Sequence, residues 1–149
     1  AMPIASMIAL RMSCTSVCCL SPHAMLQLAF AAMVAILFLQ SGLDKVFHWK
    51  GNKAWLTGHF AKGPLKGTVP VLLPVITLTE LAAGTLSAAG VVAVLLGKGL
   101  CLGTTGMALG LGAIIMLFFG QRVAKDYAGA ASLIPYFLLC AAGLWVFAC

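Results

Sequence analysis

The sequence predicts an all-α integral membrane protein, an antiparallel bundle of four membrane-spanning helices. Of the 149 residues, 62% are hydrophobic and only 8% are charged, whereas roughly 25% of the residues in a soluble domain are charged. The mean hydropathy is +1.10. Because a membrane-spanning helix needs about 20 apolar residues, this length holds four spans and little else. The composition excludes a soluble globular protein, a disordered tail and a fibrous repeat.

The first half of the chain contains two predicted spans separated by a polar loop. Residues 24–47 form the first span, and Pro22 stands just before it, where the start of a helix tolerates proline. The loop 48–68 is rich in lysine and glycine, and a short surface helix is expected at 52–60. The second span covers 70–96.

The second half contains two further spans with short connections. A tight turn at 97–99 leads into a third span at 100–120. A polar connector at 121–127 leads to the fourth span at 131–147. Because both connections are short, the second, third and fourth spans must be antiparallel neighbours.

Glycines recur at the four-residue spacing that lets helix backbones approach closely in lipid. The predicted packing positions are Gly84, Gly99, Gly103, Gly106 and Gly110. Two interpretations are open: packing within the bundle, and an interface with a second protein.

Basic residues gather in the two loops that four spans place on one side of the membrane. They are Lys45, Lys50, Lys53, Lys62, Lys66, Arg122 and Lys125. The positive-inside rule puts these loops inside and both termini outside, in a bacterial inner membrane or an energy-transducing organelle membrane. The formal charge of +6 then indicates contact with lipid headgroups and not with nucleic acid. Residues 1–23 are expected to be a separate interfacial or partner-docked segment.

Ionisable side chains at membrane depth cost about 2.5–3.5 kcal/mol each, so they are the first candidates for a site. Glu80 lies about 15 Å into the second span and must be protonated or paired with a base. Polar residues at i, i+4 and i+8 on the first span lead toward it. The predicted polar cluster comprises Gln40, Asp44, Lys45, His48, Glu80, Arg122 and Asp126.

Two interpretations of this cluster compete. The first is a structural network of hydrogen bonds that fixes the register of the helices. The second is a site for a quinone carbonyl or a relayed proton, in which Glu80 exchanges the proton and His48 relays it. His23 and Gln40 are weak candidates for binding a tetrapyrrole pigment at the bundle surface, and lipid is the third ligand to consider. No metal site is expected, because the cysteines lack a CxxC pair and the histidines do not converge.

Three stretches resemble signatures of the DoxX family of small membrane proteins. They are Gly42-Leu43-Asp44-Lys45-Val46-Phe47 with Trp49, the segment Thr79-Glu80-Leu81-Ala82-Ala83-Gly84, and the polar exit of the third span at 118–127. The resemblance covers 25–147 and implies that 24–149 form a DoxX-like four-helix membrane domain. It also implies that Lys45, Glu80, Arg122 and Asp126 are the signature polar residues.

The resemblance implies an accessory membrane subunit close to a quinone or redox complex. Members are similar to the small subunit of thiosulfate:quinone oxidoreductase, to a complex that detoxifies reactive oxygen, and to membrane chaperones. Together with the lack of a nucleophile motif in the sequence, this favours a non-catalytic subunit of a larger respiratory or photosynthetic complex. The alternatives are a quinone-interacting subunit of a thiosulfate:quinone-type oxidoreductase and a membrane assembly factor.

Overall fold

The structure, a computed structural model, describes residues 20–148. Within this range, four long apolar segments could cross a membrane: α2 (Pro22–Phe47), α4 (Val69–Leu95), α5 (Cys101–Val123), and the pair α6 (Tyr127–Ser132) and α7 (Ile134–Ala148). A shorter helix, α3 (Trp49–His59), follows α2. The predicted all-α four-helix architecture is confirmed. Most of the predicted segment 1–23 lies outside the described residues.

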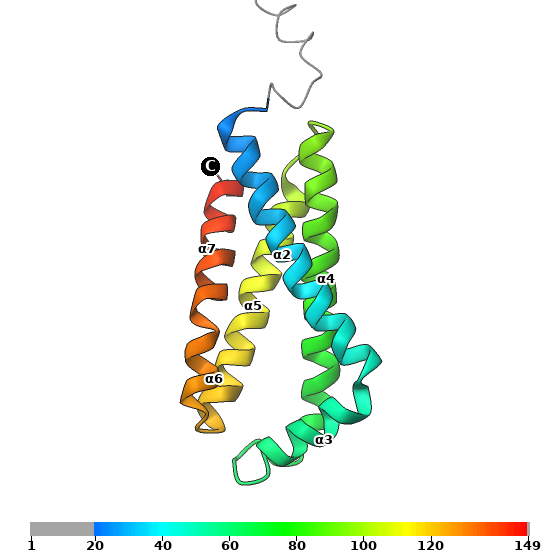
Figure 1. Cartoon of the computed structure of the whole chain (residues 1–149), viewed down its shortest axis with the longest axis vertical. Helices are drawn as coiled ribbons and strands as arrows, with labels where there is room; N and C mark the ends of the chain where they lie inside the picture. The colour runs from blue at the N-terminus through cyan, green and yellow to red at the C-terminus, as the bar shows by residue number, and fades with distance from the viewer. Residues whose placement is uncertain (1–19, 149) are drawn as a thin grey trace, which may run out of the picture.

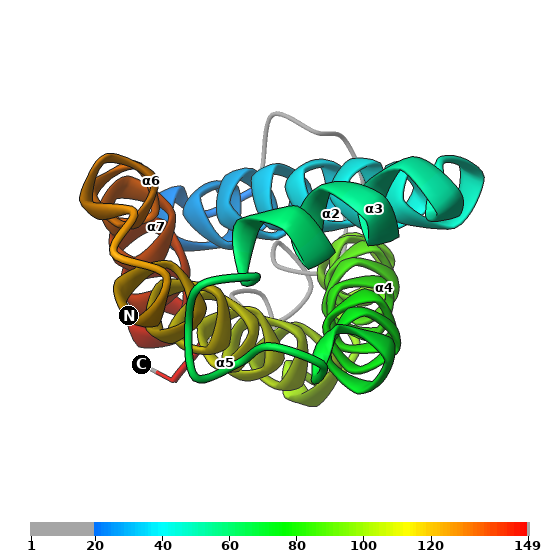
Figure 2. The ribbon, with the colours of Figure 1, turned by 90° about the horizontal axis from the view of Figure 1, so that it is seen from below.

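The four spans pack side by side with alternating direction (Figure 1). Helix α2 packs against α4 and α7, and α5 packs against α4 and α7. The view along the bundle shows this ring, with α3 lying across one end (Figure 2). We call this end, which holds α3, the C-terminus of α2 and the α5–α6 connection, the basic end. The start of α2 and the end of α7 lie together at the other end (Figure 1).

Local chemistry explains where the helices begin and break. Helix α2 starts before the predicted position because the Ser21 hydroxyl accepts a hydrogen bond from Ala24 N at 3.1 Å, which caps the first turn. The fourth span also begins early, at Tyr127, because Asp126 accepts a hydrogen bond from Gly129 N at 2.8 Å. It is interrupted at Leu133, two residues before a proline that lacks the N–H a continuous helix would use.

Glycines let α4 approach both of its neighbours. A β-carbon on Gly84 would lie 2.8 Å from Leu39 N of α2, and one on Gly90 would lie 2.7 Å from Gly103 Cα of α5. A β-carbon on Gly106 would lie 2.7 Å from Ser87 N. Such contacts leave no room for a side chain, so packing within the bundle explains these glycines.

Two other predicted packing glycines also face bundle partners, and one does not. A β-carbon on Gly110 would lie 2.9 Å from the Phe38 ring, and one on Gly103 would overlap the Phe147 ring. The prediction for Gly99 is wrong. Helix α5 begins at Cys101, so Gly99 lies in the preceding turn, where an added β-carbon meets no atom within 4 Å.

Candidate functional site

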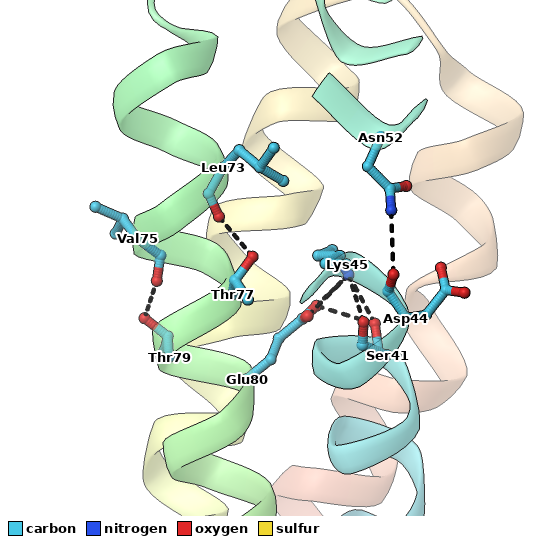
Figure 3. A network of polar contacts seen from close by, with 9 residues as sticks. All are labelled: Ser41, Asp44, Lys45, Asn52, Leu73, Val75, Thr77, Thr79 and Glu80. Carbon is cyan, nitrogen blue, oxygen red and sulfur yellow. Dashed lines mark hydrogen bonds and ion pairs between the residues drawn. The ribbon is translucent and has the colours of Figure 1, made fainter. Parts of the chain in front are cut away.

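A buried ion pair joins α2 to α4 near the basic end (Figure 3). Lys45 Nζ lies 2.8 Å from Glu80 Oε2 and 3.1 Å from Oε1. Lys45 also donates to Ser41 Oγ at 2.8 Å, and that hydroxyl donates to Glu80 Oε1 at 3.2 Å. The side chain of Glu80 is 1% exposed and that of Lys45 is 19% exposed. The three side chains form a closed hydrogen-bonded triad, which we call the Ser41–Lys45–Glu80 triad.

The backbone of α2 places the triad against α4. Ser41 and Lys45 are four residues apart and therefore share one helix face. Gly42 lies beside them, and a β-carbon there would come within 2.8 Å of the Leu81 side chain. The missing side chain lets the two helices approach, so that Lys45 reaches the carboxylate of Glu80 directly.

A cavity of about 510 Å³ adjoins the triad, and Lys45 forms part of its wall. Helices α2, α3, α4 and α5 and the loop after α3 supply its lining. The polar lining residues are Lys45, Asn52, His59 and Gln121. The others are almost all apolar, among them Leu56, Phe60, Leu73, Ile76, Met116 and Leu117. This size and this mixture of apolar walls with few polar groups are typical of a small-molecule site.

The cavity opens sideways between α4 and α5. Its lining includes Val71, Val75 and Phe119, which are 65%, 47% and 62% exposed on the outside of the bundle. All three belong to segments apolar enough to cross a membrane. The opening therefore faces lipid, and a molecule dissolved in the bilayer can reach Lys45 without passing through the packed core.

Helix α3 lies across the basic end of the bundle (Figure 2) and supplies Asn52, Trp55, Leu56 and His59 to the lining of the cavity. His59 Nε2 lies 3.1 Å from Gln121 Oε1 and 3.8 Å from Asp126 Oδ2, so the end of α3 is held to the end of α5. The rings of His59 and Trp55 stack with centroids 4.6 Å apart. Phe60 is buried, and a β-carbon on Gly120 would lie 3.5 Å from its ring. These contacts fix α3 over the cavity and present an indole and an imidazole to it.

Of the predicted polar cluster, Lys45 is the member that the structure brings to Glu80. Gln40, Asp44 and His48 are exposed, and Asp44 pairs with His48 at 3.1 Å. Successive residues on a helix point about 100° apart, so the Gln40–Asp44–His48 stripe lies on a different face from Lys45. In Figure 3 the Asp44 carboxylate points away from Glu80.

The remaining predicted residues lie apart from the triad. Arg122 is exposed and its guanidinium carbon lies 4.7 Å above the Tyr127 ring. Asp126 caps α6 and faces His59. The pigment-ligand candidate His23 lies at the opposite end of the bundle, where it is exposed and bonds Gln27 at 3.0 Å. Gln27 is buried and also donates to Val146 O at 3.3 Å.

Sequence reasoning missed Ser41 and the residues that α3 contributes. The signal for Ser41 was its position four residues before Lys45, on the same helix face. The pairing of His59 with Gln121 joins residues 62 positions apart, and no spacing rule predicts it. Comparison of the chain with known protein families, curated proteins and solved structures found no match.

Proposed function

We propose that this protein is a non-catalytic membrane subunit that binds a lipid-soluble, quinone-type ligand in the cavity beside the triad. The observation that carries the proposal is the ammonium group of Lys45, which stands in the wall of a largely apolar cavity that opens toward lipid. A ligand suited to it has a planar headgroup with hydrogen-bond-accepting oxygens and an apolar tail.

The polar residues of the lining match such a headgroup. An ammonium carries three N–H donors, and Lys45 Nζ lies within hydrogen-bond distance of the carbonyl and hydroxyl of Ser41 and of both carboxylate oxygens of Glu80. A ligand carbonyl would take over the N–H that makes the longest of these contacts, 3.4 Å to Ser41 O, while the Glu80 carboxylate holds the ammonium in place. His59 supplies a second polar contact from α3, and the Trp55 indole supplies a face for stacking. The tail would leave between α4 and α5.

Binding is measured by the quenching of tryptophan fluorescence by a short-chain ubiquinone analogue, with the protein in lipid nanodiscs. Of the three tryptophans, Trp55 lines the cavity, Trp49 begins α3 outside the lining, and Trp145 is 72% exposed on α7. We expect saturable quenching that Trp55→Phe largely removes, which leaves the background from Trp49 and Trp145. Lys45→Met should weaken binding at least tenfold, and Lys98→Met, at the other end of the bundle, should leave it unchanged.

A second variant tests the same site in case Lys45→Met fails to fold. Val75 lies at the lateral opening and is 47% exposed, so Val75→Phe narrows the opening without entering the packed core and adds no tryptophan to the fluorescence. We expect it to weaken binding as well. Quenching that is unchanged in both variants, or that persists in full in Trp55→Phe, would refute the ligand site.

We also propose that the ligand serves a larger respiratory or photosynthetic redox complex, in which another subunit performs the chemistry. The resemblance to the DoxX family supports this part of the proposal. Native gels of the source membrane in mild detergent, with mass spectrometry of each band, test it. A stoichiometric place in a large complex is expected. Transient association with unfinished complexes would instead favour an assembly factor, and a free monomer would refute the subunit role.

A further inference from the structure

We propose that the outer surface of the bundle holds an anionic phospholipid between α5 and α7, with its phosphate at Arg122 and Lys125. The site is separate from the cavity beside Lys45, and the proposal does not depend on the quinone-type ligand. It is carried by an apolar groove, by two cations next to it, and by the backbone conformation of Lys125.

The groove has a volume of about 250 Å³ and lies between the C-terminal half of α5 and the start of the fourth span. Its walls are entirely apolar: Ile114, Ile115, Phe118, Leu133, Ile134 and Phe137. Ile115 is 55% exposed and Ile134 is 50% exposed. Both belong to segments that could cross a membrane, so the groove opens toward lipid, and an acyl chain is the occupant that fits it.

Two cations lie directly beyond the groove at the basic end. Arg122 follows Phe118 by four residues on α5, so it stands on the same helix face about 6 Å closer to the basic end. Its guanidinium rests over the Tyr127 ring, which holds it on the side where α6 begins. Lys125 follows in the next turn, and both cations are exposed.

The nearby acid does not cancel this charge. The Asp126 carboxylate accepts a hydrogen bond from Gly129 N at 2.8 Å and lies 3.8 Å from His59 Nε2 of α3. Arg122 and Lys125 are exposed and form no ion pair with a carboxylate of residues 20–148, so their charges are available to an anion. A phosphodiester is a good partner for a guanidinium, which can donate two parallel hydrogen bonds to it.

The backbone at Lys125 supplies an independent argument. Lys125 has a positive backbone φ of 62°, and it is the one non-glycine residue among 20–148 that does. It closes α5 in a turn where Lys125 N donates to Arg122 O and Asp126 N donates to Gln121 O. Glycine is the usual residue at this position because a β-carbon is strained there. A lysine at a strained backbone position points to a use for its ammonium group.

The combination selects a phospholipid with net negative charge. A soluble anion would meet the two cations but not the groove, and a zwitterionic lipid would fill the groove but bring a compensating positive charge to Arg122. Only a lipid with an anionic headgroup satisfies both parts, as expected for basic residues that border grooves between membrane helices.

Native mass spectrometry of the full chain, released from nanodiscs of equal parts phosphatidylglycerol and phosphatidylcholine, tests the site. We expect the wild type to retain phosphatidylglycerol with at least a fivefold preference. Arg122→Gln with Lys125→Gln should reduce the preference below twofold. The matched control is Lys50→Gln with Lys53→Gln, which removes the same charge from α3 at the same end and should leave the preference unchanged.

Two further variants separate lipid binding from folding. Lys125→Gly removes a cation and relieves the backbone strain. The preference for phosphatidylglycerol should fall, whereas the stability of the protein to unfolding should not. Ile115→Trp fills the groove from its lipid side and should reduce retention of both lipids. An undiminished preference in Arg122→Gln with Lys125→Gln would overturn the proposal. An equal loss in the α3 control would also overturn it, because the attraction would then be general to the basic end.

Discussion

The Lys45–Glu80 pair gives the sharpest test of the packing between α2 and α4. The Glu80 side chain is 1% exposed, so Lys45→Met leaves a carboxylate without a counterion in the interior. Removing one partner of a buried ion pair costs about 3–5 kcal/mol in soluble proteins. We expect about 3 kcal/mol here, well above the ~0.6 kcal/mol average of an interhelical hydrogen bond in a membrane protein.

The two single variants should differ, because the two partners are buried to different degrees. After Glu80→Gln, the amide oxygen can still accept hydrogen bonds from Ser41 and Lys45. Lys45 is 19% exposed and borders the cavity, so its long side chain can also carry the charge toward the membrane surface. We therefore expect Glu80→Gln to cost about 1–2 kcal/mol, less than Lys45→Met.

A double-mutant cycle isolates the interaction from the effect of each substitution. The cycle uses Glu80→Met as its second single variant, which should cost about 1–2 kcal/mol, as Glu80→Gln does. Lys45→Met with Glu80→Met removes both charges and should be close to neutral, because replacing a buried pair by apolar side chains often is. With about 3 kcal/mol for Lys45→Met, the coupling free energy should then be about 4–5 kcal/mol in magnitude. The assay is unfolding in mixed micelles by sodium dodecyl sulfate, followed by far-ultraviolet circular dichroism. A coupling below about 0.5 kcal/mol, or a larger loss in Glu80→Gln than in Lys45→Met, would refute the reasoning.

Four further variants test the bundle itself. Gly103→Ala should destabilise by about 1–3 kcal/mol, because the new methyl group would overlap the Phe147 ring. Gly112→Ala on the same helix meets no atom within 4 Å, so its unfolding midpoint should stay equal or rise slightly. Asp126→Ala removes the cap of α6 and should cost about 1 kcal/mol, measured by the same detergent titration. Phe38 is 2% exposed and lies in the core. Phe38→Ala should therefore lower the free energy of unfolding by about 3–5 kcal/mol. A thermal transition that Phe38→Ala leaves unshifted would contradict this assignment of the core.

The first and last turns of the helices show how far local sequence rules reach. The four spans follow from hydropathy, since a run of apolar residues identifies a membrane helix without reference to any other part of the chain. The residues at which the helices begin were predicted less accurately. Ser21 and Asp126 extend α2 and α6 beyond the apolar runs through side-chain caps, and such caps depend on one hydrogen bond each.

The sequence by itself determined the membrane-spanning helices, their antiparallel order, and the presence of a costly acid at Glu80. Only the tertiary structure decided which residues meet that acid. The rotation of α2 about its axis, set by the close approach at Gly42 and Gly84, turns Lys45 and Ser41 inward and leaves Asp44 at the surface. The cavity also depends on α3, whose His59 contacts α5. The physical reason is that helix formation depends on neighbours in the chain, whereas side-chain packing between distant segments decides which faces of two helices meet.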